Sequence, residues 1–287
     1  MTMTILRHLC LGVMLSLSTQ ALLAKTLIVA IPKDVLADYQ KFVGKQDVLQ
    51  IVDFSGDNAR RDVVEVVLLQ QALRLGGNTD KIEFKTIDSY ARILRELESG
   101  QVLIAANSIW LADLKPLGGG IHISQAVVEN GASEAMLYTL PTNAHALKAK
   151  TLGDVRQLRA ISNQAWTADW LTLSSLKLPY LQSASTWVSM VQMVSFGRAD
   201  YLLGPFPKTS DLSLQAEGVR FVPIPQVKVR LMGSRHFVVS RRHPDGAGAF
   251  TAINAGLSQL KAKHVIEKAY TESGFQNPNF KDWHFLN

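Results

Sequence analysis

Four short segments of the chain combine charged, polar and aromatic side chains, as ligand-binding loops do. The first, residues 55–61, carries Asp57 and Arg61 directly before an apolar stretch that predicts a helix. A helix N-terminus beside an arginine can bind an anion. Alternatively, Asp57 only caps the helix and Arg61 is solvated. The sequence leaves both interpretations open, and we take Asp57 and Arg61 as candidate ligand contacts.

The second and third segments add aromatic rings. Asn107, Ser108 and Trp110 follow an apolar stretch that predicts a strand. Trp166 and Trp170 stand four residues apart. Residues four apart share one face of a helix, so both tryptophans can stack on one ligand if the helix has begun by Trp166. If it begins later, only one ring can do so, and packing of a ring in the core is the other interpretation.

The fourth segment lies near residue 200. Arg198 and Asp200 are expected to stabilise their own turn, whereas Tyr201 and Phe206 are better placed to face a cleft. Ligands of doubly wound sheets bind beyond the carboxyl ends of the strands and near the starts of helices. All four segments occupy such positions in the predicted order of elements.

Signatures of catalysis and of metal binding are missing from the sequence. The histidines show no spacing of four residues and no pairing with cysteines, which are the usual patterns of zinc ligands. There is no GxSxG nucleophile elbow, and the glycines at residues 118–120 lack the lysine of a phosphate-binding loop. We therefore predict that the chain is not an enzyme and binds no metal and no cofactor, although carboxylates such as Asp57 and Asp169 could pair in the fold.

The first 24 residues have the pattern of a secretory signal peptide. Arg7 precedes an apolar run over residues 9–23, and Ala21 and Ala24 supply the small residues of a cleavage site. A retained membrane anchor is the alternative, but the run contains polar residues and is shorter than the ~20 apolar residues of a membrane span. The pattern predicts export to the periplasm and cleavage after Ala24. Cys10, the only cysteine, would leave with the signal peptide, so no disulfide is expected.

Composition argues against one class of partner and sets the scale of the fold. The chain has 287 residues and a net charge of +6, and its basic residues are scattered along the sequence. Weak, scattered basicity argues against nucleic acid as a partner. The length is sufficient for two lobes of ordinary domain size. We expect a monomer.

Strands and helices alternate in the predicted order, which is typical of an α/β fold with a largely parallel sheet and helices on both faces. The predicted strands cover residues 26–31, 48–54, 81–87, 102–106, 135–140, 158–162, 201–203 and 236–240. The predicted helices cover residues 63–75, 89–99 and 167–176, a stretch from a Ser185 cap to Gly197, and two C-terminal segments. Thr151 and Asp154 resemble a capping box.

The three glycines at residues 118–120 interrupt this series, and a second series follows. We predict two lobes with two chain crossings between them. The first lobe is assigned residues 25–124 and 232–287, and the second lobe residues 125–231. Two crossings make a hinge, and a hinge between α/β lobes makes a ligand cleft. The helices at residues 63–75 and 250–260 should then share the first lobe.

Three segments resemble the type II periplasmic solute-binding family, which includes many amino-acid receptors of ABC importers. They are residues 151–159, residues 196–201 and residues 236–240. The tryptophan segment and the run from Arg198 to Tyr201 also resemble a divergent, largely uncharacterised exported branch of that family. The resemblance implies a two-lobed, type II periplasmic-binding-protein-like fold. It further implies a periplasmic protein that captures a small-molecule solute and delivers it to the inner-membrane permease of an ABC importer. The alternative is a sensory module that reports its ligand to a membrane sensor without transport.

The sequence departs from the amino-acid receptors of that family at two positions. Those receptors usually carry an arginine for the α-carboxylate of the ligand shortly after the strand that corresponds to residues 102–106, and residues 107–113 contain none. Their second-lobe aspartate for the α-ammonium should follow residues 201–203, where Gly204, Pro205 and Phe206 stand instead. We therefore expect standard α-amino acids to bind weakly or not at all.

Overall fold

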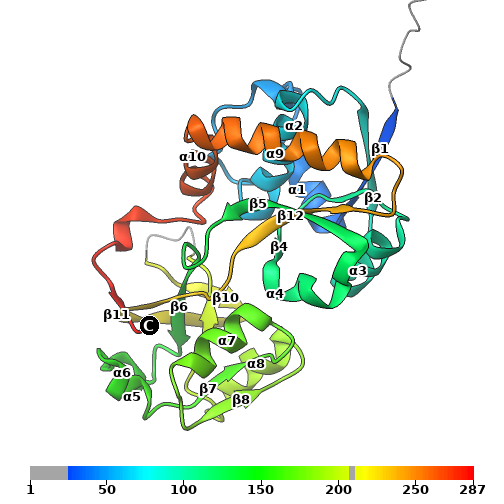
Figure 1. The fold of residues 1–287 in the computed structure, drawn as a ribbon. Coiled ribbons are helices and arrows are strands. Elements are labelled where there is room, and N and C mark those ends of the chain that lie inside the picture. The colour runs from blue at the N-terminus through cyan, green and yellow to red at the C-terminus, as the bar shows by residue number, and fades with distance from the viewer. Residues whose placement is uncertain (1–24, 207–210) are drawn as a thin grey trace, which may run out of the picture.

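The computed structural model describes residues 25–206 and 211–287 of the chain, so the predicted signal peptide lies outside the described residues. Two separate sheets organise this part, and each sheet with its helices makes one lobe (Figure 1). The predicted two-lobed α/β fold is thereby confirmed. None of the helices in the described part is long and apolar enough to span a membrane.

The first sheet lies in the upper lobe of Figure 1. Its strands are β1 (Thr26–Ile31), β2 (Lys81–Thr86), β3 (Ile104–Ala105), β4 (Ile109–Trp110), β5 (Ile121–Val128) and β12 (Arg235–Ser240). Their order is β2-β1-β3-β12-β4, with β5 beside β12. The helices of this lobe are α1 (Lys33–Val43), α2 (Arg61–Leu75), α3 (Tyr90–Ser99), α4 (Leu111–Leu114), α9 (Gly246–Ala262) and α10 (Val265–Glu272), with 3-10 turns η1 (Val48–Gln50) and η2 (Lys115–Gly120).

The second sheet lies in the lower lobe. It contains β6 (Glu134–Thr139), β7 (Ala160–Ser162), β8 (Leu181–Ser183), β9 (Tyr201–Gly204), β10 (Leu214–Ala216), β11 (Val219–Arg230) and β13 (His284–Phe285). Their order is β10-β11-β6-β9-β7-β8, and β13 pairs with β11. The helices α5 (Ala144–Leu147), α6 (Leu152–Val155), α7 (Thr167–Ser175) and α8 (Trp187–Ser195) belong to this lobe, and a 3-10 turn η3 (Pro278–Phe280) precedes β13.

Both sheets are mixed rather than largely parallel as predicted. In the first sheet β1, β2 and β3 are parallel, whereas β12 runs antiparallel to β3, β4 and β5. In the second sheet β7, β8 and β9 are parallel, whereas β6 is antiparallel to β9 and β11. The strands β12 and β6, which run against their neighbours in the two sheets, each follow directly after a passage between the lobes.

Within residues 25–206 and 211–287, the chain passes between the sheets at three places. Residues 129–133 lead from β5 to β6, and residues 231–234 lead from β11 back to β12. These two segments lie side by side, since the Leu231 amide donates to the Ser133 carbonyl at 2.7 Å and the Gly233 amide to Asn130 Oδ1 at 2.8 Å. They are the predicted hinge. The third passage, which the sequence did not predict, carries the C-terminal residues from α10 to β13 (Figure 1).

Helices α2 and α9 pack together in the core of the first lobe, as the predicted sharing of a lobe requires. Small residues let their backbones meet. A Cβ atom added at Gly256 would overlap the Ala72 carbonyl, and one added at Gly76 would overlap the Ala252 carbonyl. Glycine is therefore the residue that fits at both points of this contact.

Three predicted elements differ in the structure. Residues 48–54 are not a strand, because the Asp47 side chain accepts from the Leu49 amide at 3.0 Å and starts the turn η1. Helix α8 is capped by the Thr186 hydroxyl, which accepts from the Ser189 amide at 3.1 Å, and not by Ser185. Helix α1 and the long strands β5 and β11 were missed. The capping box of Thr151 with Asp154 is confirmed.

The contact between α2 and α9 predicts the effect of adding one methyl group. We expect Gly256→Ala to lower the free energy of unfolding by about 1–3 kcal/mol, because the new Cβ forces the helices apart. Gly248 of the same helix is the matched control, since a Cβ there meets nothing within 4 Å. Gly248→Ala should stabilise the protein by up to about 1 kcal/mol through helix propensity. Urea denaturation measures both, and equal effects at the two sites would contradict the packing argument.

Candidate functional site

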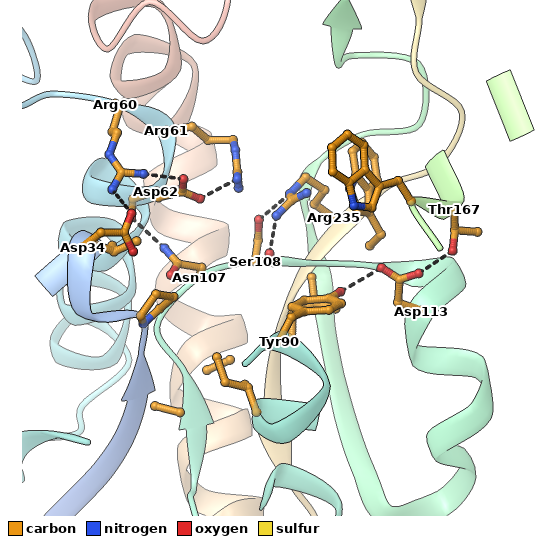
Figure 2. Close-up of a pocket in the computed structure, with 18 of the residues that line it drawn as sticks. Asp34, Arg60, Arg61, Asp62, Tyr90, Asn107, Ser108, Asp113, Thr167 and Arg235 are labelled. Atoms are coloured by element: carbon orange, nitrogen blue, oxygen red, sulfur yellow. Dashed lines mark hydrogen bonds and ion pairs between the residues drawn. The ribbon is translucent and has the colours of Figure 1, made fainter. Parts of the chain in front are cut away.

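A cavity of about 510 Å³ lies between the two lobes. Most of its wall comes from the first lobe, where β1, α2, α3 and the segment from β3 to α4 end at the cleft. The second lobe closes it with the start of α7, including Trp166, Thr167 and Asp169. Polar side chains of both lobes face each other across this space (Figure 2). A ligand in it would touch both lobes at once.

The floor of the cavity is tied together by Glu65, a completely buried carboxylate on α2. It accepts from Arg61 Nη1 at 3.1 Å, and from the amide and hydroxyl of Ser108 at 2.9 and 2.6 Å. The Tyr270 hydroxyl of α10 donates to it at 3.1 Å. A buried carboxylate is stable only when its oxygens are saturated in this way. The network therefore fixes α2, α10 and the loop after β3 in one arrangement.

Arg235, the first residue of β12, continues this network toward the cavity. Its Nε donates to the Ser108 hydroxyl at 2.9 Å, and its Nη2 donates to the Ser108 carbonyl. Its guanidinium lies over the Trp110 ring with 4.7 Å to the ring centre. Desolvation and the nearby Arg61 charge lower the pKa of Arg235. Ser108 and Trp110 thus hold the Arg235 side chain in place.

A second group of charges surrounds the N-terminus of α2. Arg60 donates to Asp34 at 2.7 Å and to Asp62 at 2.9 Å (Figure 2). It also donates to Asp38 at 3.1 Å. Asp62 also pairs with Arg61. Although burial opposes it, the three neighbouring arginines hold the pKa of Asp62 below its usual value. Arg60 and Arg61 therefore already have carboxylate partners.

Asp113 of α4 joins the two lobes. Tyr90 of α3 donates to its Oδ2 at 2.8 Å, and Thr167 of α7 donates to its Oδ1 at 2.7 Å (Figure 2). Burial, with the Asp113 charge second, raises the pKa of Tyr90 well above its usual value, so Tyr90 stays a donor. The Asp113–Thr167 hydrogen bond is a direct contact between the lobes at the edge of the cavity.

Asp169, in the first turn of α7, is the carboxylate without a partner. No other described residue donates to it or forms an ion pair with it, and its own backbone amide is its one hydrogen bond. Burial raises the pKa of Asp169 to about 6. Unpaired, desolvated carboxylates on cavity walls are typical of ligand-binding sites.

A second cavity of about 450 Å³ continues from the first toward the second sheet. The two share Arg61, Trp110, Trp166, Asp169 and Arg235 in their walls. The rest of the second cavity is mostly apolar and comes from the second lobe, the hinge and the C-terminal passage, with Ala135, Trp187, Leu203, Pro205, Leu214, Leu231 and Phe275. We call the first cavity the polar chamber and the second the apolar chamber.

Five of the nine residues proposed from the sequence line the polar chamber, namely Arg61, Asn107, Ser108, Trp110 and Trp166. Asn107 donates to the Asp62 carbonyl at 2.7 Å, which turns the loop after β3 toward the N-terminus of α2. Trp166 stacks on Trp187 with 6.2 Å between the ring centres and is 37% exposed. These five residues come from the end of one strand and the starts of two helices, and the structure places the three ends next to one another.

The other four proposed residues lie elsewhere. Asp57 is exposed and does not cap α2, whose N-cap is Arg60. Trp170 is half-buried and lines neither chamber, which matches the alternative in which α7 presents only one tryptophan. Tyr201 is completely buried in the core of the second lobe. Phe206 is buried against Phe280, with 5.4 Å between the rings.

Arg235, Tyr90, Asp113 and Asp169 were not among the proposed contacts. Arg235 stands at the amino end of β12. The rule that ligands bind beyond the carboxyl ends of strands does not select this position. Because β12 is antiparallel to β3, its amino end lies beside the carboxyl end of β3 and so reaches the cleft. Asp113 and Asp169 belong to segments that the sequence did single out, but nothing in the pattern showed which carboxylate faces the cavity.

Solved structures with this architecture are known, although their sequences have diverged far. The periplasmic VFT2 domain of BvgS from Bordetella pertussis is 14% identical over 85% of this chain and 92% of that chain, with a TM-score of 0.56. A probable amino-acid ABC transporter extracellular-binding protein from Bacillus subtilis, ytmK, is 12% identical over 88% of this chain and 100% of that chain, with a TM-score of 0.56. Substrate-binding domain 2 of GlnP from Lactococcus lactis is 14% identical over 88% and 96%, with a TM-score of 0.50.

No protein-family model matches the chain, and no curated protein matches it in sequence. The structural matches show that the chain has the fold of type II periplasmic binding proteins. The predicted fold resemblance is confirmed. At these identities the likeness shows the fold alone.

The isolation of Asp169 predicts that it destabilises the protein. Its folded pKa of about 6 lies above the usual aspartate pKa of 3.8, so the folded state binds more protons between these values. Stability is therefore lost as the pH rises through this window. We expect Asp169→Asn to raise the melting temperature by roughly 2–6 °C at neutral pH and to leave it unchanged at about pH 3.5. Calorimetry at both pH values checks this, and a lower melting temperature at neutral pH would contradict it.

Proposed function

We propose that this chain is a periplasmic solute-binding protein that closes its two lobes on a small solute held between them. The observation that carries the proposal is the polar chamber, with lining side chains from both lobes and a volume of about 510 Å³. Cavities of this size bury most of the surface of a small organic molecule. Of the nine contacts predicted from the sequence, we retain Arg61, Asn107, Ser108, Trp110 and Trp166. We add Arg235 and Asp169, which also line the polar chamber.

The hinge and the Asp113–Thr167 contact support closure as the response to the solute. Opening the cleft would break the 2.7 Å hydrogen bond between Asp113 and Thr167, while the paired hinge segments stay together. A solute that touches both lobes adds free energy to the closed form alone and shifts the population toward it. Closure is then the signal that a membrane partner can read.

Two kinds of membrane partner fit this signal. Delivery to the permease of an ABC importer is the function that we favour, since ytmK is described as a probable amino-acid ABC transporter extracellular-binding protein and the GlnP domain as a substrate-binding domain. Sensing is the second candidate, because the sequence resemblance leaves it open and the periplasmic VFT2 domain of BvgS matches with the same TM-score as ytmK. Co-purification with a permease and ATPase from native membranes would support import, and co-purification with a sensor kinase would support sensing.

A thermal-shift screen of the chain from residue 25 onward tests solute binding itself. The library should contain amines, α-amino acids, carboxylates, sugars and peptides. We expect at least one chemical class to raise the melting temperature, because a ligand at about 100 times its Kd stabilises the folded state by about 2.7 kcal/mol. Small-angle scattering with that ligand should show a smaller radius of gyration. A library without any stabilising compound would contradict the proposal.

The two tryptophans of the α7 segment provide a matched pair of variants. Trp166 lines both chambers and is 37% exposed, so Trp166→Ala should weaken binding of a stabilising compound about tenfold or more with little loss of stability. Trp170 lines neither chamber, so Trp170→Ala should leave the affinity within about twofold. Isothermal calorimetry and melting curves of both variants decide this. Equal loss of affinity in both would show that the tryptophans act through packing.

A further inference from the structure

The cleft is acidic although the chain is basic. The charged side chains that line the polar chamber are Asp34, Arg60, Arg61, Asp62, Asp113, Asp169 and Arg235. Asp38 and Glu65 stand behind them and pair with Arg60 and Arg61. Carboxylates therefore outnumber guanidinium groups around the cleft, whereas the whole chain carries a net charge of +6. Low-dielectric walls focus such a local excess of negative charge on the space between them.

Arg60 and Arg61 have carboxylate partners, Arg235 is held by Ser108 and Trp110 without an ion pair, and Asp169 has no partner among the described residues. Arg60 pairs with Asp34, Asp38 and Asp62, and Arg61 pairs with Asp62 and Glu65.

Asp169 lines both chambers without an ion pair among the described residues. The charged groups that share its chambers are Asp34, Arg60, Arg61, Asp62, Asp113, Glu134 and Arg235. Glu134 is paired with Lys228 at 2.7 Å, and Arg235 is bound to Ser108. Among the carboxylates that line the two chambers, Asp169 is therefore the one that no other described side chain contacts by a hydrogen bond or an ion pair, and a cation fits this position.

Aromatic and apolar side chains surround that position. Trp110 and Trp166 line both chambers, and Trp187 lines the apolar chamber behind Trp166. The faces of aromatic rings attract cations, most strongly when water is excluded. Farther in, Leu203, Leu214 and Leu231 offer apolar surface.

One buried polar group in the apolar chamber has no partner of its own. The Ser133 hydroxyl lies at the hinge, in a residue that is 1% exposed, and makes no hydrogen bond in the described part of the chain. Ser133 lines the apolar chamber. A buried hydroxyl without a partner is destabilising unless a ligand or water supplies one. This group therefore points to an occupant that extends past Asp169 into the apolar chamber.

We propose, on the basis of the solute-binding function above, that the solute is an organic cation, whose ammonium or guanidinium group binds Asp169 and whose mainly apolar body fills the apolar chamber. The Trp110 and Trp166 rings cover the charged group, and the Ser133 hydroxyl meets a polar atom of the body. An α-carboxylate is not needed for this mode of binding. Ser108 and Trp110 hold Arg235, which does not itself bind the cationic group.

Three probes with the same phenyl body and different charge test the assignment. They are 2-phenylethylammonium, phenylalanine and 3-phenylpropionate, measured by isothermal calorimetry on the chain from residue 25 onward. We expect the cation to bind about tenfold or more tighter than the zwitterion and the anion. Tighter binding of phenylalanine or of 3-phenylpropionate would overturn the proposal while leaving solute binding intact.

Two variants locate the charge contact. Asp169→Asn should weaken binding of 2-phenylethylammonium by about 10- to 100-fold. Asp282 is exposed, lies outside both chambers and serves as the control, so Asp282→Asn should change nothing. Melting curves of both variants confirm that they fold. Unchanged cation affinity in Asp169→Asn would overturn the proposal.

A probe whose own charge does not titrate adds an independent reading. Benzyltrimethylammonium keeps its charge at all pH values, so its affinity reports the ionisation of the protein. Because the pKa of Asp169 is about 6, affinity should fall as the pH is lowered through that value in the unmodified chain, and not in Asp169→Asn.

If none of these probes binds, the compounds found in the thermal-shift library decide. Stabilising compounds without a positive charge would overturn the cation assignment, and a library without any stabilising compound would overturn solute binding itself.

Discussion

The interaction on which the cleft depends is the burial of the Glu65 carboxylate. Glu65 is fully buried in α2, and its partners come from α2, the loop after β3 and α10. A carboxylate in that position without them would be costly, so the three elements have one compatible arrangement. Ser108 is the point at which this arrangement reaches the cavity, because its hydroxyl donates to Glu65 and accepts from Arg235. The first-lobe wall of the cleft is therefore rigid before any solute arrives.

The same network determines which charges are left for a solute. Arg61 and Arg235 are the two guanidinium groups nearest the middle of the cleft, and both are held by groups of the first lobe. In the second lobe, Asp169 has no such partner. The polar groups of the first-lobe wall are held in one network, whereas Asp169 in the second lobe has no partner among the described residues, so the cleft is asymmetric. A solute that brings a positive charge satisfies the second lobe without disturbing the first, which is the simplest way to couple binding to closure.

Sequence patterns were sufficient where a local rule decides the structure. The apolar stretch that became α2, the capping box at Thr151 and the segments around Asn107 and Trp166 all follow from spacing and residue type. They failed where a distant partner decides. An aromatic residue at the start of a strand, such as Tyr201, can face a cleft or pack in the core. Only the packing of the second lobe shows that Tyr201 is a core residue. Arg235 reaches the cleft because β12 is antiparallel to β3, and sequence spacing contains no sign of strand direction.

The C-terminal passage adds a constraint that the two-segment hinge lacks. After α10 the chain crosses to the second lobe, where Phe280 stacks on Phe206 and Phe285 lies under the Arg230 guanidinium at 3.3 Å. Asn287 then exchanges two hydrogen bonds of 2.9 Å with the Arg230 backbone. Since α10 also carries Tyr270, the partner of Glu65, this passage connects the network of the first lobe to the sheet of the second. Opening of the cleft must bend the hinge and extend the passage together, and a cleft restrained in this way loses less conformational entropy when a solute closes it.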